Sequence, residues 1–260
     1  MQEVTYTSIY DQVKALAGVT DFTSQEQTLI TTLVNRRARL AYESSDFWPR
    51  WLVVGESRNY KTTTVSAGNF VIGYTYTILT IGSTPTNWTS IGAQTATVGT
   101  VFVATGVGTG TGTATLNSNI IPYSQAGLST IDTYLRIHKS YQPFYQYSSV
   151  EVEYYVDSQG AHVVGDTAPT TSTFVTYKKD WDGPYTTAST NIPEEWKEYL
   201  GHGTYADFLR LDAQNEKALV EEKVAEGILQ DQLMKVDVTR SVGILAHRIS
   251  THMSRSYRRN

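Results

Sequence analysis

The sequence predicts a mixed α+β fold in which charged helical segments flank a small sheet and a separate all-β segment. Residues 62–131 contain no Asp, Glu, Lys or Arg, although these types make up 18% of the 260-residue chain. Short apolar runs divided by threonine and glycine fill that stretch, which is typical of short strands joined by turns. The sequence on either side has charges and a helical period.

Two helices are expected near the N-terminus. Residues 6–16 have apolar side chains at helical spacing, and Gly18 follows at a position suited to a left-handed cap. Thr23 and Glu26 predict a capping box for a second helix, whose apolar period lasts to about residue 42. Its basic cluster is interpreted as a solvated polar face and consists of Arg36, Arg37 and Arg39.

The second helix leads into the segment DFWPRW, residues 46–51. Proline keeps the residue before it out of the helical region, so the helix is expected to end here with Trp48 and Trp51 at its exit. Large aromatic side chains with one polar atom suit both cores and contact surfaces. We expect these two side chains, together with Trp196, to be core or interface anchors.

A small sheet is expected after the uncharged stretch. Residues 134–139 and 150–156 alternate with the two-residue period of strands, and Ser158-Gln159-Gly160 supplies a turn. Residues 174–178 read as a further strand.

A long helix or a helix pair is expected from Thr190 onward. Pro193 and the acids after it suit a helix N-terminus, and Gly201 and Gly203 predict a kink or the close approach of another backbone. We expect the second helix to pack on this region. The side chains expected in that contact are Leu29, Leu33, Leu40, Trp196, Leu200 and Phe208.

These elements predict three parts of the chain. Residues 1–61 and 119–240 would form the helical core with its small sheet, and residues 62–118 an inserted β domain. Residues 241–260 would be a basic tail, disordered in the free subunit and ordered on a partner. The residues expected to dock are Ile244, Leu245, Arg248, Ile249, Met253, Arg255, Tyr257, Arg258 and Arg259.

Composition excludes several classes of protein. A formal net charge of −4 is unlike a globally basic nucleic-acid binder, and the absence of cysteine excludes disulfides, thiolate metal sites and cysteine nucleophiles. No apolar stretch is long enough to span a bilayer, and the first residues do not resemble a signal peptide. We therefore expect a soluble protein with no membrane partner.

The residues that carry chemistry in other proteins do not form a catalytic pattern here. The glycines of residues 106–112 match neither a Walker nor a dinucleotide loop, and the five histidines lack zinc spacing. Asp180-Trp181-Asp182-Gly183 is interpreted as an acidic turn, and Glu151 and Glu153 as the solvent face of a strand. No nucleophile has a credible base, so we expect no enzyme activity, no metal and no cofactor.

The order of a short helix, a capped helix, a strand region and long helices resembles the head-to-tail adaptors of tailed bacteriophages. The resemblance covers about residues 1–60 and 130–240 and includes QEQTLITTLVNRRARLAYESSDFWPRW and the segment that begins TNIPEEWKEYLGHGTYADFLRL. Residues 66–115 are similar to a small β module that recurs in phage virion proteins. Neither resemblance brings catalytic residues with it.

The resemblance implies a virion protein at the head–tail junction, made in the host cytoplasm. Its copies would form a ring, twelve-fold in the family, below the portal protein, lengthening the DNA channel and docking tail or nozzle proteins. A closed ring repeats one heterologous contact, so each subunit needs two different complementary faces. The arginines of the tail could also touch channel DNA without sequence preference.

A carbohydrate-binding module of a phage tail or surface protein is the alternative. An uncharged surface suits a neutral polysaccharide, and aromatic rings stack on sugars. The rings available for this are those of Tyr74, Tyr76, Trp88 and Phe102, which fill the core of a small sandwich in the competing interpretation. An enzyme of unrecognised type is the third and weakest alternative.

Overall fold

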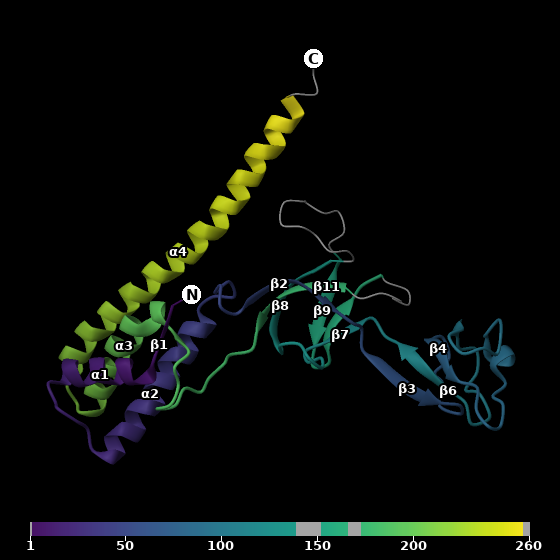
Figure 1. The fold of residues 1–260 in the computed structure, drawn as a ribbon, viewed down its shortest axis with the longest axis horizontal. Coiled ribbons are helices and arrows are strands. Elements are labelled where there is room, and N and C mark those ends of the chain that lie inside the picture. Colours follow the sequence, from purple (N-terminus) through teal and green to yellow (C-terminus); the bar gives the residue numbers. More distant parts are fainter. Residues whose placement is uncertain (1, 139–151, 166–172, 257–260) are drawn as a thin grey trace. The chain divides into compact units, whose positions relative to one another are not determined.

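The computed structural model describes residues 2–138, 152–165 and 173–256, and it describes side chains as far as residue 237. Within these ranges the protein is mixed α+β, with four α-helices and several small antiparallel sheets (Figure 1). The chain divides into two compact units. The first, the helical unit, comprises Met1–Leu52 and Asp180–Asn260, and the second, the β unit, comprises Val53–Lys179.

Four helices build the helical unit, and α3 lies against α1, α2 and α4 (Figure 1). A short antiparallel pair, β1 with β12, joins the two ends of the unit through Glu3 and Pro193. The elements are β1 (Glu3–Val4), α1 (Tyr6–Ala17), α2 (Ser24–Glu43), β12 (Ile192–Pro193), the 3₁₀ turn η2 (Glu194–Trp196), α3 (Lys197–Leu211) and α4 (Asn215–Ser256).

The expected helix signals at the N-terminal end are confirmed. Gly18 caps α1 in the left-handed conformation with φ 70°, which suits a residue without Cβ. Thr23 and Glu26 form the capping box of α2: the Thr23 hydroxyl accepts from the Glu26 amide, and the Glu26 carboxylate accepts from the Thr23 amide.

The core of the helical unit uses a different face of α2 from the one expected. Ile30, Val34, Ala38 and Ala41 are fully buried in it, whereas Leu40 is 44% exposed. Leu33 is buried but is not a member of that core, and Leu29 is half-buried. The expected packing of α2 on α3 is present, but the core of the helical unit takes the face with Ala38 and Ala41 from α2, and Leu40 is left largely exposed. From α3 and η2, Trp196 and Leu200 are core members and Phe208 packs against them.

Two helices, α3 and α4, follow β12, so of the expected long helix or helix pair the structure has the pair. Pro193 does not begin the α-helix: it ends β12, and η2 separates it from α3. The close approaches at Gly201 and Gly203 are to side chains, those of Gln12 and Arg37, and not to another backbone. The turn between α3 and α4 includes Ala213 with φ 59°, a left-handed position.

The backbone of residues 241–256 continues α4 without a break. The expectation of a disordered segment beginning at residue 241 therefore does not match the structure. The side chains of this stretch and residues 257–260 lie outside the described part of the chain.

Two three-stranded sheets surround the first core of the β unit. Their orders are β2-β11-β8 and β7-β10-β9, all antiparallel. The core contains Ile137, Val175, Tyr177 and Ala161. The strands are β2 (Leu52–Arg58), β7 (Ile120–Pro122), β8 (Ile131–His138), β9 (Tyr154–Asp157), β10 (Gly160–Val163) and β11 (Thr173–Lys179).

Three of the expected strand signals fall in this part. The strands expected at 134–139 and 174–178 are confirmed as β8 and β11 over their described residues, and the turn at residues 158–159 joins β9 to β10. The strand expected from residue 150 begins only at Tyr154, and residues 150–151 lie outside the described ranges. Gly160 adopts φ 141°, and a Cβ there would lie 2.1 Å from the Ile121 carbonyl oxygen, so β7 and β10 meet only because this residue is glycine.

The uncharged segment forms a four-stranded antiparallel sheet, the β module, in the order β3-β6-β4-β5. Its own core includes Phe70, Tyr76, Trp88 and Phe102. Phe70 lies in the loop between β3 and β4. The elements are β3 (Thr62–Ser66), β4 (Thr75–Thr80), the 3₁₀ turn η1 (Trp88–Ile91), β5 (Val101–Val103) and β6 (Thr113–Asn117).

Candidate functional site

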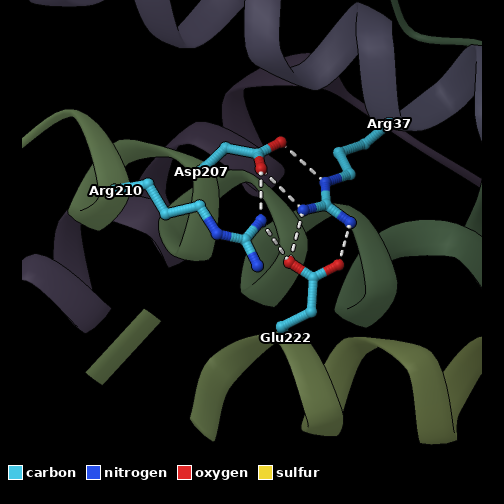
Figure 2. Close-up of polar contacts among 4 residues, drawn as sticks. All are labelled: Arg37, Asp207, Arg210 and Glu222. Carbon is cyan, nitrogen blue, oxygen red and sulfur yellow. Dashed lines mark hydrogen bonds and ion pairs between the residues drawn. The ribbon is translucent and has the colours of Figure 1, made fainter. Parts of the chain in front are cut away.

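A buried charge cluster joins α2, α3 and α4 (Figure 2). The Arg37 guanidinium donates from Nε and Nη2 to both Asp207 oxygens at 2.7 Å, and from Nη1 and Nη2 to both Glu222 oxygens at 2.8 Å. Arg210 adds a second cation, with Nη1 2.6 Å from Glu222 Oε2 and 3.2 Å from Asp207 Oδ1. Two arginines and two carboxylates thus make a neutral cluster at the junction of three helices.

The arrangement of the helices brings these four residues together. Asp207 and Arg210 are one turn apart on α3, so both side chains reach the same point from one helix. Gly203 lies one turn before Asp207 and leaves room for the Arg37 side chain. Arg37 was expected on a solvated face, and that interpretation is wrong, because the side chain is only 7% exposed. Arg36 and Arg39 are exposed as expected.

Every charged group of the cluster is paired with a group of opposite charge. Burial alone would lower the pKa of Arg37, but the hydrogen bonds that its guanidinium donates to Glu222 and Asp207 outweigh burial and raise that pKa. The hydrogen bond from Arg37 holds the pKa of Glu222 below its usual value, although partial burial opposes the shift. Because both carboxylates accept from arginine, neither is placed to act as a general base. What the geometry provides is a clamp that orients α4 on α2 and α3.

The three tryptophans expected as anchors meet in the core of the helical unit. Trp51 stacks on Trp196 with ring centroids 4.7 Å apart, and Trp48 meets Trp196 edge-on at 5.6 Å. The Trp48 indole N–H donates to the Ala41 carbonyl at 2.8 Å, which ties the turn back to the end of α2. All three are buried in the subunit, so they anchor the core.

A second polar junction explains the acidic motif at residues 180–183. Arg50 donates to Glu3 at 2.7 Å and to Asp182 at 2.8 Å, and Tyr185 donates to the other Asp182 oxygen at 3.1 Å. Burial raises the pKa of Tyr185, and the Asp182 charge adds to that rise. Arg50 therefore ties the DFWPRW turn to the N-terminal strand through Glu3 and to the returning chain through Asp182.

A third junction lies between α1, α3 and α4. His202 Nδ1 is 2.6 Å from Glu221 Oε2, and Gln12 donates to Glu198 at 2.6 Å. These side chains bridge neighbouring helices of the same unit, as the buried cluster does.

One buried arginine of the β unit was not singled out by its sequence pattern. Arg58, at the end of β2, is fully buried and donates to the Tyr177 hydroxyl at 2.6 Å and from Nε to Glu56 at 2.9 Å. The partners lie within the same sheet and its edge, so this group orders β2 against β11.

The aromatic side chains of the β module do not form a sugar-binding platform. Tyr76, Trp88 and Phe102 are buried in its core, as the competing interpretation expected, and only Tyr74 is exposed, at 54%. One ring without a second exposed aromatic residue from this set offers little stacking surface.

Among the described residues, no three His, Asp or Glu side chains gather as a metal site, and no helix is long and apolar enough to cross a bilayer. Glu153 is exposed next to β9, and Glu151 lies outside the described residues.

The residues expected to dock fall at the end of α4. Ile244, Leu245, Arg248, Ile249, Met253 and Arg255 have helical backbone, and their side chains are not described. Tyr257, Arg258 and Arg259 lie outside the described residues. The sequence matches no protein-family model and no curated protein.

Proposed function

We propose that this protein is a structural component of a bacteriophage virion, the adaptor between head and tail. Its copies form a ring below the portal protein, lengthen the DNA channel and offer a surface to tail or nozzle proteins. The resemblance of the sequence is to this family, and the helical unit has the helix order on which the resemblance rests: a short helix, a capped helix and a final helix pair.

The observation that carries the proposal is the length of α4. This helix has 42 residues, whereas α3, on which it packs, has 15. Among the α4 side chains that are described, the last to pack on the core of the helical unit is Val236. Helices gain most of their stability from packing, so a long extension favours a protein partner. In this proposal the partner is the portal.

The polar clusters fit a protein that is built into an assembly and performs no reaction. Arg37 and His202 bind carboxylates from neighbouring helices, and Arg50 binds Asp182 of the returning chain, so these contacts hold the segments of the helical unit together. A rigid subunit loses little conformational entropy on assembly. The proposal therefore includes no catalytic residue, metal or cofactor, and it places the protein at the head–tail junction of the virion.

The test uses the full-length protein and the portal protein of the same virus. Light scattering and electron microscopy should find a cyclic assembly seated on the portal ring at physiological salt. A variant lacking residues 241–260 should keep its helical circular dichroism and its unfolding midpoint but lose attachment. A wild-type protein that stays monomeric and does not attach to the portal would refute the proposal.

A second pair of variants separates protein docking from DNA contact. Replacing the four tail arginines with glutamine should leave portal attachment within about twofold, because apolar contact would remain. Replacing Ile244, Leu245, Ile249 and Met253 with serine should abolish attachment. The reverse result, with a strong salt dependence, would assign the tail to DNA.

A further inference from the structure

α4 has apolar residues on two opposite sides. On one side Ala225 and Leu229 pack in the core of the helical unit. On the other side Val220, Val224 and Met234 are 62%, 41% and 57% exposed. A row of apolar side chains that the subunit leaves in solvent, on a helix that is otherwise charged, indicates a contact with another molecule.

The exposed row has the spacing of a coiled-coil seam. From Val220 this row, the outer stripe, runs through Val224, Gly227, Asp231 and Met234 at alternating intervals of four and three residues, and each of these positions is exposed. A Cβ atom at Gly227 would meet nothing within 4 Å, so the middle of the outer stripe has room for a partner's side chain. Side chains at these intervals fit between those of a second helix, and the partner is therefore expected to be helical.

The outer stripe leads into the segment proposed to dock on the portal. α4 is one unbroken helix (Figure 1), so the same intervals can be followed beyond Met234. In the sequence they lead to Val238, Ser241 and Leu245. Leu245 is one of the residues expected to dock. The outer stripe and that residue thus occupy positions on one side of one continuous helix.

The charge of the outer stripe indicates the chemistry of the partner. Asp231 is its only charged residue between residues 220 and 234, and it has no hydrogen-bond or ion-pair partner in the described part of the chain. A carboxylate enclosed between two helices is costly unless a cation faces it. Two α4 helices meeting in parallel, as copies around a ring axis would, place Asp231 opposite itself, and like charges repel. The charge therefore favours a different protein over a second copy of this chain.

We propose that the outer stripe of α4 packs along a helix of the portal protein as a coiled coil, with a lysine or arginine of that helix facing Asp231. The inference rests on the proposed function and extends its docking site, which then begins at Val220 and not at residue 241. The seam from residue 220 to residue 245 is about 38 Å long at the rise of an α-helix.

Serine variants of the full chain test the seam with the portal protein of the same virus. Val220→Ser/Val224→Ser should weaken portal binding roughly tenfold, because two apolar contacts are lost. The matched control is Leu211→Ser/Leu219→Ser, since these leucines are 62% and 54% exposed but lie outside the outer stripe. Both variants should keep the helical circular dichroism of the wild type. If both bind the portal as tightly as the wild type, the seam is overturned and the adaptor function stands.

Charge reversal tests the cation expected on the portal helix. Asp231→Lys should weaken portal binding roughly tenfold, since it places two cations opposite each other. Glu226→Lys makes the same change in charge at an exposed position of α4 outside the outer stripe, and it should have a much smaller effect. Equal effects of the two variants, or tighter binding by Asp231→Lys, would overturn the charged contact.

Cross-linking identifies the partner, because the absence of cysteine allows one benzophenone label at a chosen position. Irradiation should join a label on Met234→Cys to the portal, whereas a label on Glu226→Cys should give little of that product. If the Met234→Cys label joins another copy of this chain instead, the partner is a second copy and the proposal is overturned. A wild-type protein that does not bind the portal would refute both this contact and the proposed function.

Discussion

Gly203 on α3 and Arg37 on α2 are in close contact: a Cβ atom at position 203 would lie 3.1 Å from Arg37 Cδ and 3.2 Å from its Nε. Such a methyl group needs the arginine to move by a few tenths of an ångström. Arg37 cannot move freely, since two carboxylates hold its guanidinium. A glycine inside a helix is therefore tied to the buried cluster.

Gly203→Ala should consequently destabilise the protein, although glycine-to-alanine changes in exposed helix positions usually stabilise by about 0.5–1 kcal/mol. Gly227→Ala on α4 is the matched control, because nothing lies within 4 Å of a Cβ there. Urea unfolding of the two variants should give opposite signs. Equal stabilisation by both would mean that the guanidinium adjusts without cost.

Arg37→Gln should reduce the free energy of unfolding by about 3–5 kcal/mol, since it leaves the buried Asp207 carboxylate without its main partner. Arg36→Gln, one residue earlier on the same helix, should change it by no more than about 0.5 kcal/mol in the monomer. The comparison is made by chemical denaturation at neutral pH. A small effect of Arg37→Gln would show that the cluster contributes little net stability.

The Glu222 interaction should depend on pH. Its pKa is lowered in the folded protein, chiefly by the hydrogen bond from Arg37, from an ordinary value of 4.5. A carboxylate with a depressed pKa contributes its stabilisation fully above the unfolded value and loses it as the pH falls through the folded value. The stability difference between wild type and Glu222→Gln should be constant near neutral pH and shrink below about pH 4.5. Glu226→Gln, which removes one carboxylate from an exposed position of α4, is the matched control.

The sequence predicts the helices that have clear end signals. It does not predict which faces of those helices pack on one another. Gly18 and the Thr23–Glu26 capping box are local signals, and both mark helix ends in the structure. The burial of Arg37 is decided by Asp207 and Glu222, residues distant in sequence, so no local pattern could indicate it.

The choice of face on α2 was missed for a related reason. That helix has two apolar stripes, and the one with the leucines has the larger side chains. The core uses the other stripe, where Ala38 and Ala41 allow close packing. A sequence with two apolar faces does not say which one its own fold places in the core.

Ile30→Ala and Leu40→Ala should therefore differ sharply in the isolated subunit. Ile30 is fully buried in the core of the helical unit, so truncating it should cost about 2–5 kcal/mol. Leu40→Ala should cost no more than about 0.5 kcal/mol. Thermal or urea unfolding of both variants checks the assignment. A large loss from Leu40→Ala in the monomer would mean that the core does use the leucine stripe.

The β module should be removable without loss of the helical unit. The two chain segments that lead into and out of it lie side by side: the Lys61 amide donates to the Ile120 carbonyl at 2.6 Å, and the Ser118 hydroxyl donates to the Lys61 carbonyl at 2.6 Å. The module has its own core, and a short linker can therefore bridge the gap where insertions are tolerated.

A variant in which a short Gly/Ser linker joins Lys61 to Asn119 should keep the helical circular dichroism of the wild type and a cooperative unfolding transition. The control disrupts the module instead of removing it. Trp88→Ala opens a cavity in the module core, so it should unfold the module and leave the α-helical signal in place. Collapse of the helical signal in the linker variant would mean that the module is needed to fold the rest of the chain.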